Sequence, residues 1–209
     1  GGLASMNAED ALAFYDEYGF SDWTYASTGA QMLAVRHAEF EFNYGANPSP
    51  MAKMGYTCAD CHMGTVTDEE TGVEYTDHNI QSPLDKPELL ASCNTCHTDL
   101  ASEVASIQED IDGRTHELGL RAEQFIFNFE DKVAIPDADG NLVFDMDTAL
   151  ANGLTEDQVA RLQEIQRYAC YYWNFAAAEN SEGAHNPDMF NDLLDEADEI
   201  LGVSSIVEA

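Results

Sequence analysis

The chain has 209 residues, of which 40 are Asp or Glu and 8 are Lys or Arg, so its formal net charge at pH 7 is -32. That charge repels nucleic acid and the anionic face of a bilayer, and it favours cationic partners. The apolar content of 44% is enough for a packed core, but no apolar run approaches the roughly 20 residues of a membrane-spanning helix. Length and composition therefore predict a folded chain that neither binds nucleic acid nor spans a membrane.

The N-terminal part of the chain reads as helical. Apolar residues at helical spacing predict one helix over residues 7–18, which ends at Gly19, and a second over residues 27–44. The run Asn47-Pro48-Ser49-Pro50 then breaks any helix, because proline removes a backbone donor and restricts the residue before it. An acidic loop rich in Thr and Gly is predicted over residues 64–83.

The C-terminal half is dominated by long helical patterns. Pro87 is placed as a first-turn proline that opens a short helix, and a long helix is predicted over residues 99–133. Residues 135–145 carry Asp-Gly-Asn turn chemistry, which is typical of a small hairpin. A capping box opens a helix over residues 155–180, and the last helix is predicted over residues 187–202. Convincing strand alternation is absent, so we expect a mainly α fold with little or no β structure.

Two C-x-x-C-H motifs carry the chemistry of the chain, one at residues 58–62 and one at residues 93–97. Two thiols separated by two residues can add to the two vinyl groups of one porphyrin, which places the following histidine under the iron. We therefore predict two covalently bound haem c groups. The predicted attachment residues are Cys58, Cys61, Cys93 and Cys96, and the predicted proximal iron ligands are His62 and His97.

Other uses of the cysteine pairs are less consistent with the sequence. The pairs lie farther apart than the roughly 15–20 residues of common zinc ribbons, and a histidine directly follows each pair. A zinc site or a pair of disulfides would leave these two histidines unexplained. Cys170 lies on a predicted helix without a partner motif, and we interpret it as a buried, unreactive thiol.

Each haem also needs a distal ligand. The candidates are His37, His78, His116, His185, Met51, Met54 and Met63. A lone histidine in a helix more often packs or faces solvent than binds metal, which is our interpretation of His116. His185 lies directly before Asn186-Pro187 at the start of a helix, a rigid position that is suited to aiming a ligand. Spacing alone does not choose further among the candidates.

The order of these segments resembles the C-terminal part of the ammonia-forming cytochrome c nitrite reductases. The segments that carry the resemblance are residues 20–23, 36–41, 58–63, 77–84, the second haem motif and residues 179–187. Members of that family carry five haems, and this chain has counterparts of only the last two. The absent part includes the motif whose proximal ligand is lysine and whose iron binds nitrite, together with the family's catalytic arginine and tyrosine. The resemblance implies that this chain alone has no open iron site for nitrite.

The resemblance also implies a set of ligands. His62 and His185 match the proximal and distal ligands of the first haem, and His97 matches the proximal ligand of the second. The family's distal histidine for the second haem falls at Met51, which implies a His/Met haem or a shift of the ligand to Met54. A thioether ligand would raise the reduction potential relative to two histidines.

Some positions match residues that, in the family, act on a haem, a substrate or a calcium ion that this chain would not bind by itself. His78 matches a ligand of a haem that the absent part would bind, so it would ligate a haem of another chain, face solvent, or be recruited to a local haem. His37 matches the family's active-site histidine, and it would be catalytic only if a partner completed the active site. Two positions that are usually Lys and Gln near the family's calcium read Ala34 and Arg36, so we expect no calcium site of that type.

These observations predict one dihaem domain over residues 1–209, a mainly α multihaem cytochrome c with long C-terminal helices. We expect a helical lead-in over residues 1–57, a haem-binding segment over residues 58–97 and a helical segment over residues 98–209.

Three functions are consistent with this sequence. The one we favour is electron transfer, as a soluble dihaem cytochrome or as a subunit of a larger cytochrome assembly. The second is one half of a split nitrite reductase whose active-site haem lies on another chain, in which case the chain is no enzyme on its own. The third is a structural or sensory module descended from the enzyme.

The expected partners are redox proteins, among them cytochrome chains that would share His78, in a homo- or hetero-oligomer. The aromatic residues at helical spacing, which would serve the core or such an interface, are Phe125, Phe127, Tyr168, Tyr172 and Phe175. Haem attachment needs an extracytoplasmic compartment, so we expect a periplasmic or extracellular chain. Residues 1–6 show no signal peptide, and we expect the sequence to be that of a mature or truncated chain.

Overall fold

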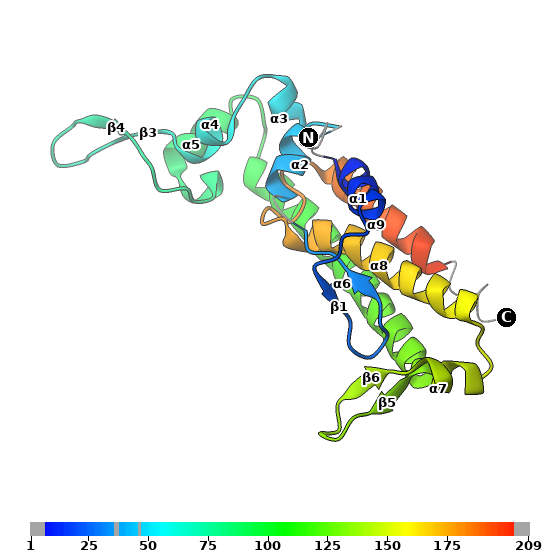
Figure 1. The fold of residues 1–209 in the computed structure, drawn as a ribbon. Helices are drawn as coiled ribbons and strands as arrows, with labels where there is room; N and C mark the ends of the chain where they lie inside the picture. The colour runs from blue at the N-terminus through cyan, green and yellow to red at the C-terminus, as the bar shows by residue number, and fades with distance from the viewer. Residues whose placement is uncertain (1–6, 36–37, 46, 203–209) are drawn as a thin grey trace.

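The computed structural model describes residues 7–35, 38–45 and 47–202. Three long helices, α6 (Leu100–Val133), α8 (Glu156–Ala178) and α9 (Pro187–Gly202), pack side by side in an elongated bundle (Figure 1). Residues 50–98, which we call the arm, project from one end of this bundle. The mainly α fold that the sequence predicts is confirmed.

The shorter elements cover the bundle or build the arm. Before the arm come α1 (Ala8–Glu17), β1 (Trp23–Thr24), β2 (Gln31–Met32) and α2 (Ala38–Tyr44). The arm contains α3 (Pro50–Lys53), α4 (Cys58–His62), β3 (Thr65–Thr67), β4 (Glu74–Thr76), the 3-10 helix η1 (Pro83–Asp85) and α5 (Pro87–Cys93). Between α6 and α8 lie β5 (Ala134–Pro136), β6 (Leu142–Phe144) and α7 (Met146–Ala151). The strands form three two-stranded antiparallel sheets, β1–β2, β3–β4 and β5–β6, so the expectation of little β structure is confirmed.

The bundle helices begin where the sequence predicts, because side chains cap their first turns. The Asp99 carboxylate accepts a hydrogen bond from the N–H of Ser102, which starts α6. Thr155 and Gln158 form the predicted capping box at the start of α8. Asn186 accepts from the N–H of Met189 at the start of α9. The described helices are too polar or too short to cross a bilayer.

Apolar side chains of the three helices fill the space between them. The most deeply buried large side chains of the bundle are Phe129, Val133, Val159, Leu162, Ile165, Tyr171, Phe190 and Leu194. Of the aromatic residues that the sequence assigns to core or interface, Phe125, Tyr172 and Phe175 are buried, Tyr168 packs at the edge of the core, and Phe127 is exposed. The buried members of this set therefore serve the core of the chain itself.

Arg167 on α8 holds the N-terminal segment against the bundle. Its guanidinium donates to the carbonyl oxygens of Gln31 and Phe20, at 2.6 and 2.9 Å, and to the Asp16 carboxylate at 3.0 Å. The Tyr171 hydroxyl of the same helix donates to the carbonyl oxygen of Ala8 at 3.0 Å. The Arg167 bonds join the end of α1, the residues that follow it and β2 to α8, and the Tyr171 bond joins the start of α1 to the same helix.

The predicted helix over residues 27–44 is confirmed only over 38–44, where α2 lies, and it is wrong at its start, where the chain forms the β1–β2 turn and strand β2. Gly29 adopts the left-handed region with a φ of 72°, and its N–H donates to the carbonyl oxygen of Tyr25, which closes the turn between β1 and β2. The Thr28 hydroxyl in the same turn donates to Gln166 of α8 at 2.7 Å. Hydrogen bonds to a distant helix override the local helical pattern here.

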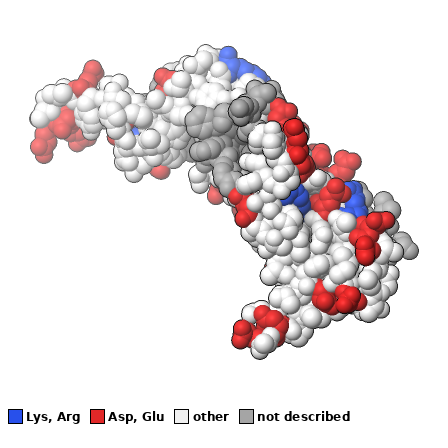
Figure 2. All heavy atoms as spheres, in the orientation of Figure 1, with Lys and Arg blue, Asp and Glu red and all other residues white. Residues whose placement is uncertain are grey.

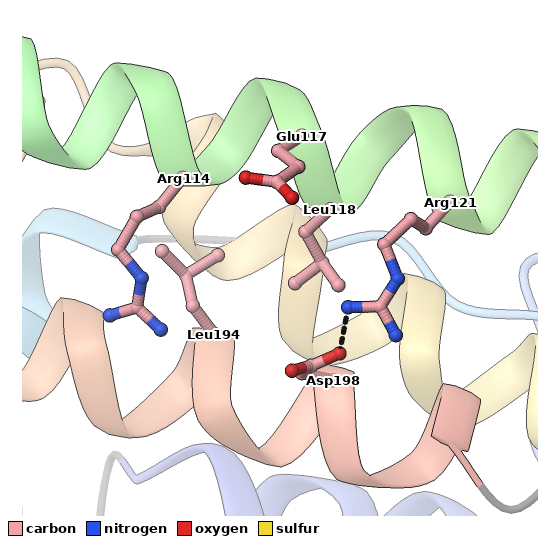
Figure 3. Close-up of a pocket in the computed structure, with 6 residues that line it drawn as sticks. All are labelled: Arg114, Glu117, Leu118, Arg121, Leu194 and Asp198. Carbon is pink, nitrogen blue, oxygen red and sulfur yellow. Dashed lines mark hydrogen bonds and ion pairs between the residues drawn. The ribbon is translucent and has the colours of Figure 1, made fainter.

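Two arginines of α6 reach across to α9. Arg114 pairs with Asp195 at 2.7 Å, and Arg121 pairs with Asp198 beside a shallow opening of about 120 Å³ (Figure 3). Since acidic side chains already engage both arginines, this opening is explained by the contact between the two helices. Elsewhere on the visible face, carboxylates gather over the tips of the β3–β4 and β5–β6 hairpins (Figure 2). Arg114 and Arg121 thus join α6 to α9, and the carboxylates of the two hairpin tips lie on the surface.

Replacing Arg167 with methionine should lower the free energy of unfolding by about 1.5–3 kcal/mol, because it removes the charged donor that serves two carbonyl oxygens and the partly exposed Asp16 carboxylate. Urea unfolding followed by far-UV circular dichroism measures the change. Arg161→Met on the same helix is the matched control, since its pair with Glu164 is exposed and should contribute less than about 1 kcal/mol. Equal losses in the two variants would contradict this account of Arg167.

Candidate haem site

The first haem motif coincides with a short capped helix. Helix α4 spans Cys58–His62, and a capping box with Thr57 starts it. The N–H and the hydroxyl of Thr57 both donate to the Asp60 carboxylate, at 2.7 and 2.6 Å, and these bonds hold the pKa of Asp60 below its usual value. The motif residue Asp60 therefore fixes the turn that carries the two thiols.

The second motif packs against the first. Helix α5 ends at Cys93, and the N–H groups of Cys96 and His97 donate to its carbonyl oxygen, so the turn continues through the motif. Gly64 lies so close to α5 that a Cβ there would come within 1.8 Å of Leu89 Cδ2. Burial first and then the neighbouring Cys93 thiol raise the pKa of Cys61. The structure thus brings all four predicted attachment cysteines into one part of the arm.

His62 and His185 come together from distant parts of the sequence. Their ring centroids are 6.1 Å apart, with an angle of 75° between the planes. The Nδ1 atom of His62 lies 2.8 Å from the carbonyl oxygen of Gln81, and Nδ1 of His185 lies 2.5 Å from Glu179 Oε1. Because both Nδ1 atoms have hydrogen-bond partners, Nε2 of each ring is left to bind metal.

This spacing fits an iron ion between the rings. Metal–imidazole nitrogen bonds are about 2 Å long and each nitrogen lies about 1 Å from its ring centre, so two imidazoles on opposite sides of one metal have centroids about 6 Å apart. The observed separation is 6.1 Å. That these two histidines bind the same haem iron stays a prediction, and the geometry supports it.

The loop from Glu179 to Asn186 aims His185. The Glu179 carboxylate accepts from the N–H and the hydroxyl of Ser181, at 2.8 and 2.6 Å, and the Ser181 hydroxyl in turn accepts from the N–H of His185 at 2.9 Å. Burial works to raise the pKa of Glu179, but the hydrogen bonds from His185 and Ser181 outweigh it and lower that pKa. Gly183, with a φ of 97°, packs against Ile111 of α6.

Asn186 anchors the same loop to the start of the arm. Its side chain is buried, and it donates to the carbonyl oxygens of Phe42 at 3.0 Å and Asn47 at 2.8 Å. The neighbour of His185 is therefore bonded to the segment that leads into the first haem motif. This contact, between residues far apart in the sequence, places the two histidines opposite each other.

His97 has a carboxylate partner in Glu103 of α6, with Nδ1 and Oε2 2.9 Å apart and both side chains nearly half exposed. Met51 on α3 and Met54 directly after it are exposed as well, at 38% and 64%. Both thioethers are therefore open to solvent. Met51 as the distal ligand stays a prediction.

His78 is exposed on a loop that Lys86 holds in place. The Lys86 ammonium is buried, and it donates to the carbonyl oxygens of His62 and Asn79 and pairs with Asp77 at 2.8 Å. The hydrogen bond from Lys86 is the main cause that lowers the pKa of Asp77. The three acceptors use all three N–H donors of the Lys86 ammonium. The loop that carries the exposed His78 is therefore fixed by this buried lysine.

Of the predicted catalytic and calcium positions, His37 and Arg36 lie outside the described residues. The N–H of Ala34 donates to Asp22 at 2.8 Å. Within the described ranges, no three His, Cys, Asp or Glu side chains are grouped as a metal site would need. Cys170 on α8 is partly buried, and burial raises its pKa to about 11, so its thiol stays protonated at neutral pH.

The arm has almost no core of its own. Among residues 50–110, leaving aside 88 and 92, whose burial is not described, the one buried side chain is that of Lys86. A segment of this size without buried apolar side chains needs another source of cohesion, such as a metal or a covalent cofactor. Two porphyrins attached at the four cysteines would supply the missing apolar centre, so the residues present fit the predicted haems.

Residues 3–202 match the family model described as cytochrome c552. The chain belongs to the cytochrome c552 family. Covalently bound haem c is therefore expected of it, which agrees with the two C-x-x-C-H motifs.

Curated cytochromes c-552 from several bacteria are similar to this family member. The protein from Desulfotalea psychrophila is 31% identical over 206 residues, which cover 96% of this chain and 36% of the relative. The one from Parabacteroides distasonis is 30% identical over 89% of this chain and 34% of its own length. The chain thus spans about a third of the length of these relatives.

Two solved structures share the fold. The catalytic subunit NrfA of the cytochrome c nitrite reductase from Desulfovibrio desulfuricans, described with two calcium sites, aligns with a TM-score of 0.74 at 25% identity, over 96% of this chain and 41% of that chain. The outer cell wall cytochrome OcwA aligns with a TM-score of 0.50 at 20% identity, over 93% of this chain and 34% of that chain. The second similarity bears on the fold alone.

Replacing Gly183 with alanine should displace His185, because a Cβ there would lie 2.7 Å from Cγ1 of the buried Ile111 and φ is positive. Gly140→Ala is the matched control, since its φ is also positive but its Cβ would meet open space. We expect the control to lose only about 1–2 kcal/mol of stability. Gly183→Ala should in addition raise the high-spin fraction in the haem absorption spectrum. An unchanged spectrum at full occupancy would contradict this role of Gly183.

Proposed function

We propose that this chain is a dihaem c-type cytochrome that carries electrons, most readily as a subunit of a larger cytochrome assembly. We further propose that it corresponds to the C-terminal part of the multihaem nitrite reductases, forms a single dihaem domain and resides in the periplasm or outside the cell. The observation that carries the proposal is the His62–His185 pair, whose rings are 6.1 Å apart with both Nδ1 atoms engaged. When bound, each haem supplies a one-electron couple.

The residues of the chain have separate roles in this proposal. Cys58 and Cys61 would attach the first haem, and His62 and His185 would both bind its iron. Cys93 and Cys96 would attach the second haem, with His97 as its proximal ligand and Met51 as its distal ligand. An iron with two protein ligands has no open position for a substrate, so this arrangement suits electron transfer rather than catalysis.

The first test counts haems and identifies a ligand. Intact-mass analysis of the protein made with a cytochrome maturation system should show two haem masses, and Cys58→Ser with Cys61→Ser should show one. His185→Ala should keep both masses but open the first iron, so that the reduced variant binds carbon monoxide and the parent does not. His116→Ala on α6 is the control and should behave as the parent does. A parent without haem would end the proposal.

A second candidate function is one half of a split ammonia-forming nitrite reductase. It is favoured by the exposed His78 on its Lys86-supported loop, together with the similarity to a catalytic subunit. In that case His78 would ligate a haem of a partner chain, and His37 would join an active site that the partner completes. The acidic surface would then meet the basic face of the partner.

Nitrite turnover separates the two candidates. The purified dihaem chain should not reduce nitrite with reduced viologen. If a second haem chain co-purifies, the complex should turn nitrite over, and His78→Ala should abolish either assembly or the activity. Lys53→Ala, a change on the exposed α3 of the same arm, should leave both intact. Turnover by the isolated chain would contradict the electron-carrier proposal.

A further inference from the structure

The predicted iron ligands differ in the group that faces their Nδ1 atoms. His62 has a neutral backbone carbonyl from Gln81. His185 has the carboxylate of Glu179, whose side chain has no exposure to solvent. His97 has the carboxylate of Glu103, whose side chain is 47% exposed. The three ligands thus experience three different electrostatic environments.

A carboxylate at Nδ1 strengthens an imidazole as an electron donor. The negative charge draws the Nδ1 proton toward itself and makes Nε2 more basic, which favours the ferric iron over the ferrous iron. Away from solvent the charge is poorly screened, so a buried carboxylate acts more strongly than an exposed one. A neutral carbonyl has the weaker effect.

Glu179 is built to remain charged and aligned. Ser181 donates two hydrogen bonds to Oε2, at 2.8 and 2.6 Å, which leaves Oε1 to accept from His185 at 2.5 Å. Gln108 of α6 donates to the carbonyl oxygen of Ser181 at 3.2 Å, which ties the loop to the bundle. A carboxylate with three hydrogen bonds tolerates burial that an unpaired one would not.

We infer that Glu179 is a positioning residue that lowers the reduction potential of the first haem, and that Glu103 does the same to the second haem to a smaller degree. The inference rests on the proposed ligation by His185 and His97. It implies that the chain sets the two potentials separately, through one buried and one exposed carboxylate. The reduction potential of the first haem is then lower than two histidine ligands without the Glu179 carboxylate would give.

Spectroelectrochemical titration of the full chain, at fixed pH and salt, tests this inference. Glu179→Gln removes the charge with little change in shape. At a given solution potential, the ratio of reduced to oxidised first haem should rise about tenfold, which is an upward shift of about 59 mV for a one-electron couple. Glu103→Gln should change only the titration of the second haem. Its ratio of reduced to oxidised haem should rise by less than about threefold, because solvent screens the Glu103 carboxylate.

Ser181→Ala should shift the reduction potential of the first haem in the opposite direction. It removes one donor from the Glu179 carboxylate and concentrates the negative charge on His185, so the first haem's potential should fall. A purely structural role would move both variants in the same direction, since either change would loosen the loop. Opposite shifts support the inference if mass analysis still counts two haems and both irons stay low-spin.

Two further outcomes would overturn the inference. One is an unchanged first wave in Glu179→Gln with both haems attached, and the other is an equal shift of both waves. If Glu179→Gln does not fold, an unchanged or raised potential in Ser181→Ala overturns the inference by itself. These results differ from failure of the proposed function, in which the parent protein would carry no haem or would bind carbon monoxide without any substitution.

Discussion

The carboxylate of Glu179, held without solvent exposure at the end of α8, is the contact on which the geometry of the site depends. It receives hydrogen bonds from Ser181 and His185, and the next residue in the chain, Asn186, is bonded to Phe42 and Asn47 at the entrance of the arm. One short loop therefore connects two bundle helices, a ligand and the root of the arm. If that loop moved, the histidine pair would separate even though the helices stayed packed.

The bundle and the arm are stabilised by different interactions. The bundle is stabilised by buried apolar side chains such as Phe129, Ile165 and Phe190, in the ordinary manner of helical proteins. The arm relies on polar bonds around Lys86 and, under the proposed function, on haems attached at its two motifs, because its described apolar side chains are not buried. The chain can therefore lose cofactor-dependent order in the arm while the bundle remains folded.

Much of the fold could be predicted because its signals are local. The capping box at Thr155, the first-turn Pro87 and the hairpin after α6 each depend on residues within a few positions of one another. The first part of the helix expected over residues 27–44 is absent, because the turn there is fixed by a hydrogen bond to Gln166, which lies on α8. Local patterns carry no information about a partner more than a hundred residues away.

The same distinction applies to the site. The two cysteine pairs and the histidines that follow them stand out in the sequence because c-type haem attachment uses a contiguous motif, and their roles stay predictions. The roles of Glu179 and Lys86 could not be predicted, since neither residue belongs to a recognisable spacing and both act through hydrogen bonds that exist only in the folded chain. In a sequence with 40 acidic residues, nothing local marks Glu179, the carboxylate that is buried beside the proposed ligand His185.

The length of α6 separates the two ends of the chain. This helix has 34 residues, which at 1.5 Å per residue extend over about 50 Å, and it begins directly after the second C-x-x-C-H motif. The β5–β6 hairpin at its far end is therefore remote from both motifs. Under the proposed function, a redox partner bound at that hairpin would be too distant to exchange electrons with the predicted haems, so it would have to approach the arm.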